Sequence, residues 1–229
     1  MHSKTVCLHK ETIRISNLFQ ILQDASGEAA AAWHSSGEDL ARIGLMWVVV
    51  RYEVLVKRQF VPGEALTVHT WASPFRHHMS QRNYLICDET GQCVAEAAGI
   101  WTVVDRVSRS MVNAEESGIH FQAEITGNET PRPTTPRKLP LQHQTRYIVC
   151  EKDLDMNGHM NNTKYFDVVQ DLMEQSNGTT EFSRIQAVYS NEAKLGDELL
   201  IRWGKDASDW FFCGEKNGEP CFQIGFQSE

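Results

Sequence analysis

The sequence predicts an α+β protein made of two tandem units, each with one long helix packed against a strongly bent antiparallel sheet. Three observations support this prediction. Similar strand and turn patterns recur in the same order along the chain, each half contains one helical segment, and each helical segment precedes the longer strands. With 229 residues, the chain is long enough for two domains of about 100 to 130 residues with sizeable cores.

The repeat is clearest at a glycine turn that leads into a strand. Residues 61–68 contain a glycine, an acid and then a strand pattern, and residues 194–201 repeat this order. A hairpin follows in each half, with turns at 88–92 and 215–219 that contain Thr-Gly and Asn-Gly. The matched glycines lie roughly 130 residues apart, about one small domain, which indicates a gene duplication.

Each half has one segment that fits a helix better than a strand. In the first half, Ser16 is expected to cap a helix that continues to the Ala-rich segment 29–32 and ends near Trp33. In the second half, Gly178 is expected to end a helix whose apolar residues follow the 3.6 period. These apolar residues are Tyr165, Phe166, Val168, Val169, Leu172 and Met173. One long helix against a bent antiparallel sheet, repeated twice, matches the hotdog fold in double form.

A proline-rich stretch separates the two halves. Four of the seven prolines are Pro131, Pro133, Pro136 and Pro140. This composition predicts an extended, polyproline-like linker over residues 113–142, between an N-terminal unit (1–112) and a C-terminal unit (143–229).

Composition excludes several classes of protein. The longest apolar run, residues 45–50, is far too short to span a membrane, and the start of the chain has no secretory signal pattern, so a cytoplasmic location is expected. The net charge of −8 disfavours a nucleic acid partner. The six cysteines form no Cys-x-x-Cys pair, which disfavours a zinc ribbon or a disulfide framework.

The most specific segment lies immediately before the second helix. It reads Asp155-x-Asn157-x-His159-x-Asn161-Asn162-x-x-Tyr165. Here the sequence resembles acyl-acyl carrier protein thioesterases, in which such a run opens the helix of the C-terminal hotdog. The resemblance extends over nearly the whole chain, with further landmarks at 45–52, 68–71 and 187–193. It implies hydrolysis of fatty acyl-acyl carrier protein thioesters without a cofactor or metal, with an acidic carrier protein as partner.

A further functional position of the family is a glutamate that is followed by cysteine in plant members. Glu192 keeps the acid, but Ala193 replaces the thiol, so a cysteine nucleophile at this position is excluded and water is the expected nucleophile. Hydrolysis needs a base, an oxyanion donor and a group that orients the base, and Asp155, Asn157, His159 and Glu192 offer these groups. Alternation in an extended segment is expected to put the first three on one side. The sequence leaves open which carboxylate is the base and whether an acyl-enzyme forms on Asp155.

Some residues of this segment have simpler interpretations. An Asp-x-Asn-Gly-His stretch alone is more typical of a loop than of an active site. We interpret Asn161 and Asn162 as caps and loop ties, Tyr165 as a packing residue and Cys150 as a small buried hydrophobe rather than a displaced nucleophile.

The first half lacks an equivalent site. Residues 9–17 have no alternating Asp, Asn and His, and Lys57-Arg58-Gln59 has no acid that corresponds to Glu192. One active site is therefore expected, with the first half shaping the acyl pocket and Trp33 or Trp47 as candidates for its lining. His77 and His78 are expected to be exposed loop residues rather than metal ligands.

Three alternatives stay open from sequence: an acyl-CoA thioesterase, a hotdog dehydratase and a noncatalytic acyl-binding module. The acidic carrier protein requires a local basic surface, for which the chain offers three candidate clusters. These clusters are Lys57 with Arg58, Arg76 to Arg82 with His77 and His78, and Arg132 with Arg137 and Lys138. The sequence leaves open the acyl chain preference and whether the protein is a monomeric pseudo-dimer or a homodimer.

Overall fold

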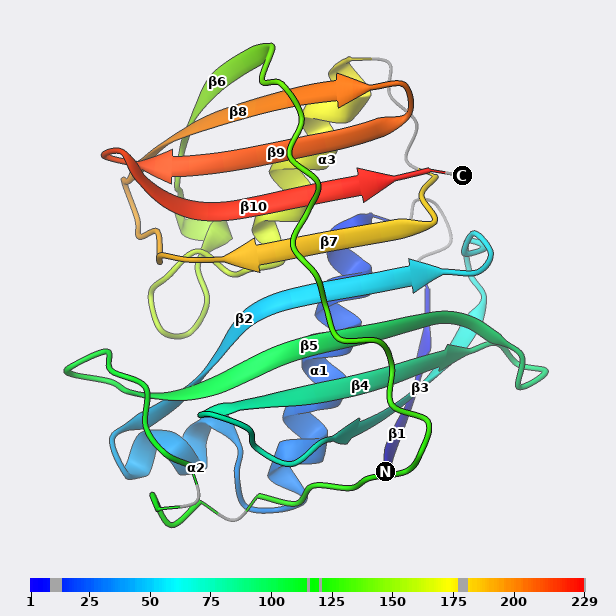
Figure 1. The fold of residues 1–229 in the computed structure, drawn as a ribbon, viewed down its shortest axis with the longest axis vertical. Helices are drawn as coiled ribbons and strands as arrows, with labels where there is room; N and C mark the ends of the chain where they lie inside the picture. The colour runs from blue at the N-terminus through cyan, green and yellow to red at the C-terminus, as the bar shows by residue number, and fades with distance from the viewer. Residues whose placement is uncertain (9–13, 115, 120, 177–180, 229) are drawn as a thin grey trace. The chain divides into compact units, whose positions relative to one another are not determined.

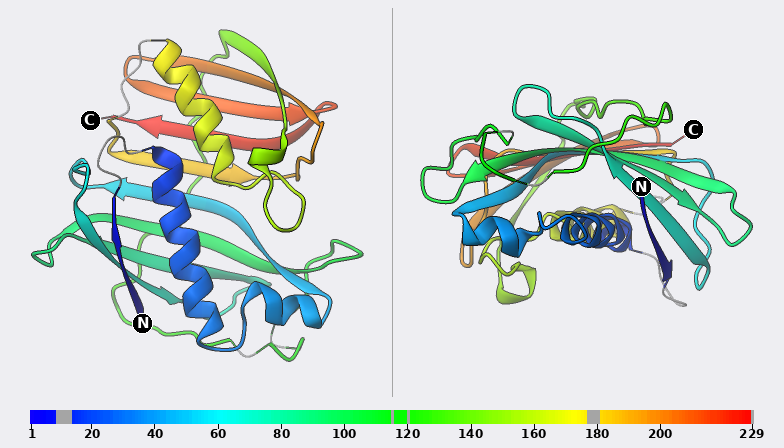
Figure 2. Two further views of the ribbon diagram at one scale, coloured as in Figure 1. Left: turned by 180° about the vertical axis from the view of Figure 1, so that it is seen from behind. Right: turned by 90° about the horizontal axis from the view of Figure 1, so that it is seen from below.

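The computed structural model describes residues 1–8, 14–114, 116–119, 121–176 and 181–228. The chain forms two compact units. The first contains Met1–Ile13 and Gln20–Pro133, and the second contains Arg14–Phe19 and Thr134–Glu229. Each unit has one long helix on one face of its own antiparallel sheet, as the sequence predicts (Figure 1 and Figure 2).

The first unit has a five-stranded sheet in the order β1-β3-β4-β5-β2. The helices are α1 (Ile15–Ala31), whose residues 15–19 belong to the second unit, and α2 (Gly37–Arg42). The strands are β1 (His2–Cys7), β2 (Leu45–Val56), β3 (Ala65–Ala72), β4 (Met79–Cys87) and β5 (Cys93–Asp105). Its largest fully buried side chains include Tyr52, Tyr84, Leu22, Leu66 and Ile86.

The second unit repeats this arrangement with strand order β6-β8-β9-β10-β7. Its helices are η1 (Glu151–Asp153) and α3 (Lys164–Gln175). The strands are β6 (His143–Ile148), β7 (Arg184–Tyr189), β8 (Glu198–Asp206), β9 (Asp209–Lys216) and β10 (Glu219–Gln227). Because β6, α3 and β7 to β10 follow the same order as β1, α1 and β2 to β5, the predicted internal repeat is confirmed.

Both long helices lie where the sequence predicts them, but the predicted N-cap of the first helix, Ser16, is wrong. Helix α1 begins at Ile15, so Ser16 lies inside it, and the Ser16 hydroxyl donates to Asp167 Oδ1 at 2.6 Å instead of capping. Arg14 Nε also donates to Asp167 Oδ1, at 2.9 Å, so the start of α1 is tied to α3 by side-chain contacts that propensity does not encode. Helix α3 ends at Gln175, and Gly178 lies outside the described residues.

Residues 121–142, which form most of the expected linker, contain no helix and no strand. In the first unit, the Thr130 hydroxyl donates to Asn83 Oδ1 at 2.9 Å, and Arg51 Nη1 donates to the Pro133 carbonyl at 3.1 Å. In the second unit, the linker packs against glycine positions on β8 and β10. The linker thus follows the face of each sheet opposite the helix (Figure 1).

None of the helices in the described part of the chain is long and apolar enough to cross a membrane.

Candidate active site

The loop before α3 is a tight turn. Asp155 Oδ1 accepts the backbone N–H groups of Asn157 at 2.8 Å and His159 at 3.1 Å. The Asp155 N–H donates to the His159 carbonyl at 2.7 Å, and Gly158 has a φ of +78° that disfavours other residues. The expected extended segment with three side chains on one side is therefore wrong, because the Asp155 carboxylate folds the loop back on itself.

Backbone contacts hold this turn against the segment that follows β7. The Met160 N–H donates to the Ala193 carbonyl at 2.7 Å, and His159 forms a bridge with Lys194. The sequence suggested that Glu192 lies in a strand. Strand β7 ends at Tyr189, however, so Glu192 lies beyond it. The chain turns here because the Lys194 N–H donates to Asp197 Oδ2 at 2.7 Å and Gly196 takes a φ of +81°.

This arrangement brings His159 and Glu192 together. His159 Nε2 lies 3.1 Å from Glu192 Oε2, with 11% of the histidine and 38% of the glutamate side chain exposed. The Lys216 ammonium donates to the Glu192 backbone carbonyl at 3.0 Å, which holds the glutamate segment in place. A buried imidazole therefore contacts a carboxylate that solvent can reach.

The other two predicted residues form a separate pair. The Asn157 side-chain amide lies 3.4 Å from Asp155 Oδ2, and Asn157 itself is exposed. Asp155 is linked to His159 only through the backbone of the turn. The four predicted residues thus lie in one loop region as two pairs, Asn157 with Asp155 and His159 with Glu192.

A supporting network beneath the loop was missed by the sequence analysis. The buried Asp153 carboxylate accepts from the Tyr147 hydroxyl at 2.8 Å, the Cys150 N–H at 2.9 Å and the Cys150 thiol at 3.1 Å. Burial, together with the Asp153 carboxylate, raises the pKa of Tyr147. Cys150 is therefore a half-buried hydrogen-bond donor rather than a buried hydrophobe. The signal in the sequence was an acid two positions before Asp155.

The start of α3 behaves as predicted for Asn161 and Tyr165. Asn161 Oδ1 accepts the backbone N–H and the hydroxyl of Thr163, both at 3.0 Å, and so ties the loop to the helix. The Tyr165 ring packs 4.6 Å from the Phe222 ring, and burial raises the pKa of Tyr165. These residues therefore shape the site without carrying its chemistry.

The equivalent position in the first unit has other contacts. Gln59 lies four residues before Gly63, as Glu192 lies four residues before Gly196. The neighbouring Arg58 pairs with Glu64 at 2.7 Å and with Asp88 at 3.2 Å. Residues 9–13 of the expected counterpart loop lie outside the described residues. His77 and His78 are exposed turn residues, as predicted. Within the described ranges, no three His, Cys, Asp or Glu side chains are arranged to hold a metal ion.

The first unit contains an apolar cavity of about 180 Å³. The sequence analysis proposed Trp33 or Trp47 as lining of an acyl pocket. Trp47 lines this cavity, whereas Trp33 is 51% exposed and does not line it. The cavity is lined from α1, β2, β4 and β5, and Phe121 also contributes.

Comparison with known sequences gives two family matches. The acyl-ACP thioesterase N-terminal domain matches residues 8–119, and the acyl-ACP thioesterase C-terminal domain matches residues 138–213. A chloroplastic palmitoyl-acyl carrier protein thioesterase of Gossypium hirsutum is 26% identical over 170 residues, which are 68% of this chain and 41% of that protein. The chain thus spans about two fifths of the length of this relative.

Solved structures give the same fold. An acyl-ACP thioesterase from Bacteroides thetaiotaomicron superposes with a TM-score of 0.82 at 20% identity, covering 99% of this chain and 97% of that one. The 12:0-ACP thioesterase from Umbellularia californica gives a TM-score of 0.78 at 18% identity, covering 98% and 95%. The predicted double hotdog fold is confirmed by these neighbours. Since the two domain matches together cover most of its length, the chain belongs to the acyl-ACP thioesterase family.

Proposed function

We propose that this chain hydrolyses fatty acyl-acyl carrier protein thioesters to free fatty acid and holo-acyl carrier protein. The observation that carries the proposal is the 3.1 Å contact between His159 Nε2 and Glu192 Oε2, which joins the family's loop to the segment after β7. An imidazole beside a carboxylate is suited to proton transfer near neutral pH.

In the proposed reaction, water attacks the carbonyl carbon of the thioester. The His159–Glu192 pair accepts a proton from this water, the C–S bond breaks, and the departing thiolate takes the proton. Glu192 is the carboxylate nearer to solvent, which favours it as the group that meets water. The exposed amide of Asn157 is the proposed donor to the developing oxyanion.

Asp155 has a different proposed role, as a positioning residue. Its Oδ1 already accepts two backbone N–H groups, so its carboxylate stabilises the turn that presents Asn157 and His159. A base or nucleophile in this position would have to give up these hydrogen bonds. The geometry therefore favours water attack assisted by Glu192 over an acyl-enzyme on Asp155.

The acyl chain is proposed to occupy the cavity of the first unit. Trp47, Phe121, Ala30 and Ala72 supply apolar surface there, as a hydrocarbon requires. This assignment gives the unit without the His159–Glu192 pair a function of its own.

The test is release of free thiol from an acyl-acyl carrier protein and from the acyl-CoA with the same chain, using one purified sample. We expect a higher kcat/KM with the acyl-acyl carrier protein than with the acyl-CoA. Preference for acyl-CoA would support the alternative acyl-CoA thioesterase, and no release from either substrate would support a noncatalytic acyl-binding module.

A further inference from the structure

The cavity in the first unit exists because one face of α1 carries small side chains. Ser26 and Gly27 lie on this face with Ala30 one helical turn further on, and these residues leave space in front of the sheet. The resulting volume of about 180 Å³ is roughly ten times what one water needs. The cavity is therefore large enough for part of a ligand.

A cationic side chain lines this cavity, whose wall is mostly apolar but also includes Gln23, Ser26 and Ser80. Arg82 lies on β4 between the buried residues Ser80 and Tyr84, and side chains two positions apart share one face of a strand. Its cross-strand partner on β5 is Gly99, which has no side chain to cover the guanidinium. Arg82 keeps some accessible surface, as expected for a residue that faces a cavity.

Arg82 lacks the partner that a buried guanidinium needs. Its hydrogen bond within the described residues is to Thr70 Oγ1 at 3.5 Å, and it forms no ion pair with a described carboxylate. Burial lowers the pKa of Arg82 because the protein around it solvates the charge poorly. By contrast, Arg58 in the same unit contacts two carboxylates at the surface. An unpaired buried cation is unfavourable, which makes an anionic ligand the natural complement.

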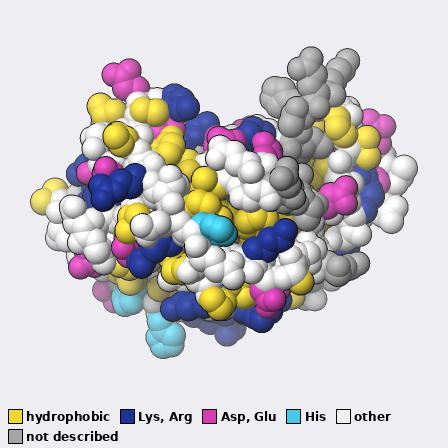
Figure 3. All heavy atoms as spheres, turned by 90° about the horizontal axis from the view of Figure 1, so that it is seen from above, with side chains coloured by type: hydrophobic (Ala, Val, Ile, Leu, Met, Phe, Trp, Pro, Cys, Tyr) yellow, Lys and Arg dark blue, Asp and Glu magenta, His cyan; other side chains and the backbone are white. Residues whose placement is uncertain are grey.

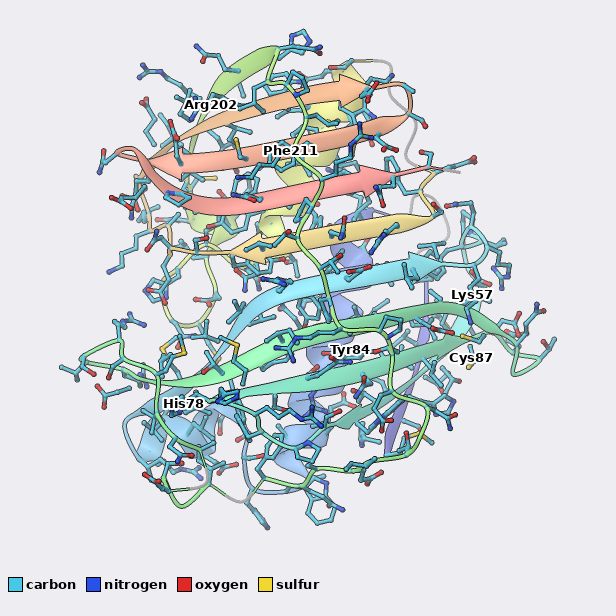
Figure 4. The ribbon with its side chains drawn as sticks, in the orientation of Figure 1. Lys57, His78, Tyr84, Cys87, Arg202 and Phe211 are labelled. Atoms are coloured by element: carbon cyan, nitrogen blue, oxygen red, sulfur yellow. The ribbon has the colours of Figure 1, made fainter. Side chains whose placement is uncertain are left out.

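The other polar groups of the cavity wall reinforce this preference for an acceptor. The Ser26 and Ser80 hydroxyls donate to the Leu22 and Ser73 carbonyls, so their hydrogens are already used. The Trp101 indole N–H, which can only donate, lies near the Tyr84 hydroxyl but has no acceptor in good hydrogen-bond geometry among the described residues. Tyr84 lies on β4 in the interior of the first unit (Figure 4). The cavity wall thus offers the Arg82 guanidinium and the Trp101 N–H as donors to a carboxylate, and apolar surface elsewhere.

We propose that the cavity of the first unit binds the carboxylate end of an aliphatic chain, with Arg82 as its anchor. A guanidinium can hold a carboxylate with two parallel N–H···O bonds, and an aliphatic chain fits Trp47, Phe121 and the alanines. A chain that ends in a methyl group would contact the apolar wall without using Arg82. The carboxylate belongs either to a free fatty acid or to the far end of a dicarboxylic acyl chain. The inference rests on the proposed function only for this origin of the ligand.

Direct binding tests this inference without any catalytic step. The affinities of decanoate, methyl decanoate and decanol are measured by calorimetry for the wild type, Arg82→Met, Arg82→Lys and the control Arg106→Met. Arg106 is an exposed arginine of the same unit. We expect the wild type and Arg106→Met to bind decanoate at least about 10-fold more tightly than decanol, and Arg82→Met to bind both alike. Arg82→Lys should keep part of the preference, since it keeps the charge but loses the fork.

Several outcomes would overturn the inference. These are equal affinity for decanoate and decanol in the wild type, or an unchanged preference in Arg82→Met. If Arg82→Met does not fold, the test rests on Arg82→Lys, whose decanoate preference must fall below that of the wild type. A Trp47→Phe, Trp101→Phe double variant locates the ligand, because both tryptophans line this cavity and their loss should remove most of any fluorescence change on decanoate binding.

Two kinetic arms distinguish the sources of the carboxylate. If the ligand is free fatty acid, decanoate should inhibit thioester hydrolysis by the wild type more strongly than by Arg82→Met. If it is a dicarboxylic acyl chain, a thioester with a terminal carboxylate should have a lower KM than its methyl-ended counterpart, and Arg82→Met should abolish the difference. If the protein binds decanoate through Arg82 but hydrolyses no thioester, the proposed function is wrong and this inference stands.

Discussion

The two units share a backbone framework but differ in the residues that it presents. In both, an acid of the glycine turn accepts an N–H three residues earlier, at 2.7 Å from Val61 to Glu64 and at 2.7 Å from Lys194 to Asp197. Both glycines, Gly63 and Gly196, have a φ above +80°. What differs is the residue four positions before each glycine, which is Gln59 in one unit and Glu192 in the other. Duplication preserved the turn, while side-chain substitutions made the units different.

The interiors of the units differ as well. The second unit buries Phe166, Phe212, Phe222 and Phe226, which fill the space between its helix and sheet. The first unit has small residues on α1 and a cavity of about 180 Å³. The comparison teaches that the unit with the 155–159 loop is filled by aromatic side chains, whereas the other unit retains a cavity.

The largest expected effect concerns the pair that the first unit lacks. Glu192→Gln and His159→Ala are each expected to lower the turnover of acyl-acyl carrier protein by at least about 100-fold, because proton transfer contributes that much. Asn157→Ala should act similarly through loss of an oxyanion donor. Steady-state thiol release measures the effect, and circular dichroism checks folding.

The matched control for this prediction is Gln59→Ala, at the corresponding exposed position of the first unit. It should leave turnover within about 2-fold of the wild type, as surface substitutions usually do. Near wild-type activity in Glu192→Gln would contradict a functional difference between the two units.

A second prediction separates positioning from direct chemistry at Asp155. Asp155→Ala removes the acceptor for the Asn157 and His159 N–H groups and should lower turnover by about 100-fold. Asp155→Asn keeps an acceptor oxygen and should lose about 10-fold or less. Equal losses in both variants would instead indicate that the charge of Asp155 takes part directly. Single-turnover hydrolysis in oxygen-18 water should then be examined, because label in the Asp155 carboxylate would show an acyl-enzyme.

A third prediction tests how the linker binds the second unit. A Cβ on Gly204 would lie 1.9 Å from the Pro140 carbonyl oxygen, so Gly204→Ala must displace the linker. We expect its free energy of unfolding to fall by about 1–3 kcal/mol, measured by urea denaturation.

Gly37→Ala is the control for this variant, because its Cβ would meet nothing within 4 Å. At the matching position of the first unit stands Trp71, whose relative exposure is 3%. An unchanged stability in Gly204→Ala would mean that the linker adds nothing to the second unit.

The smallest expected effect concerns docking of the carrier protein. Lys57 pairs with Glu96, Arg58 with Glu64 and Arg137 with Asp206. Among the exposed arginines and lysines of the three clusters, Arg76, Arg132 and Lys138 form no ion pair with a described residue, whereas Arg82 lines the cavity. Lys57 and His78 lie at opposite ends of the first unit's sheet, so their clusters cannot act as one patch (Figure 4). On the face drawn in Figure 3, basic and acidic side chains are interspersed.

Charge reversal at Arg76, Arg132 and Lys138 should therefore raise the KM for acyl-acyl carrier protein by about 10-fold or less and weaken its salt dependence. Turnover of a short acyl thioester should not change. If reversal of all three clusters leaves this KM untouched, the docking proposal is wrong and the acyl-CoA alternative gains support.

The sequence analysis succeeded wherever a local pattern repeated. Matched glycines, hairpin turns and two apolar helix faces were enough to predict the double hotdog, because each of these signals depends on neighbouring residues. It failed at Ser16 and at the 155–159 loop, where side chains form hydrogen bonds that compete with the expected backbone conformation. Asp153 was missed for the same reason, since its role depends on Tyr147 and Cys150.

The sequence by itself determined the fold class, the duplication and the loop that carries Asp155, Asn157 and His159. Periodicity, turn residues and motif spacing are local properties, and they are readable without contacts. Only the tertiary structure decided that His159 meets Glu192, that Asp155 turns inward to hold the loop, and that Arg82 faces a cavity without a carboxylate. These facts depend on which distant segments pack together, because burial and hydrogen bonding are set by neighbours that are remote in the chain.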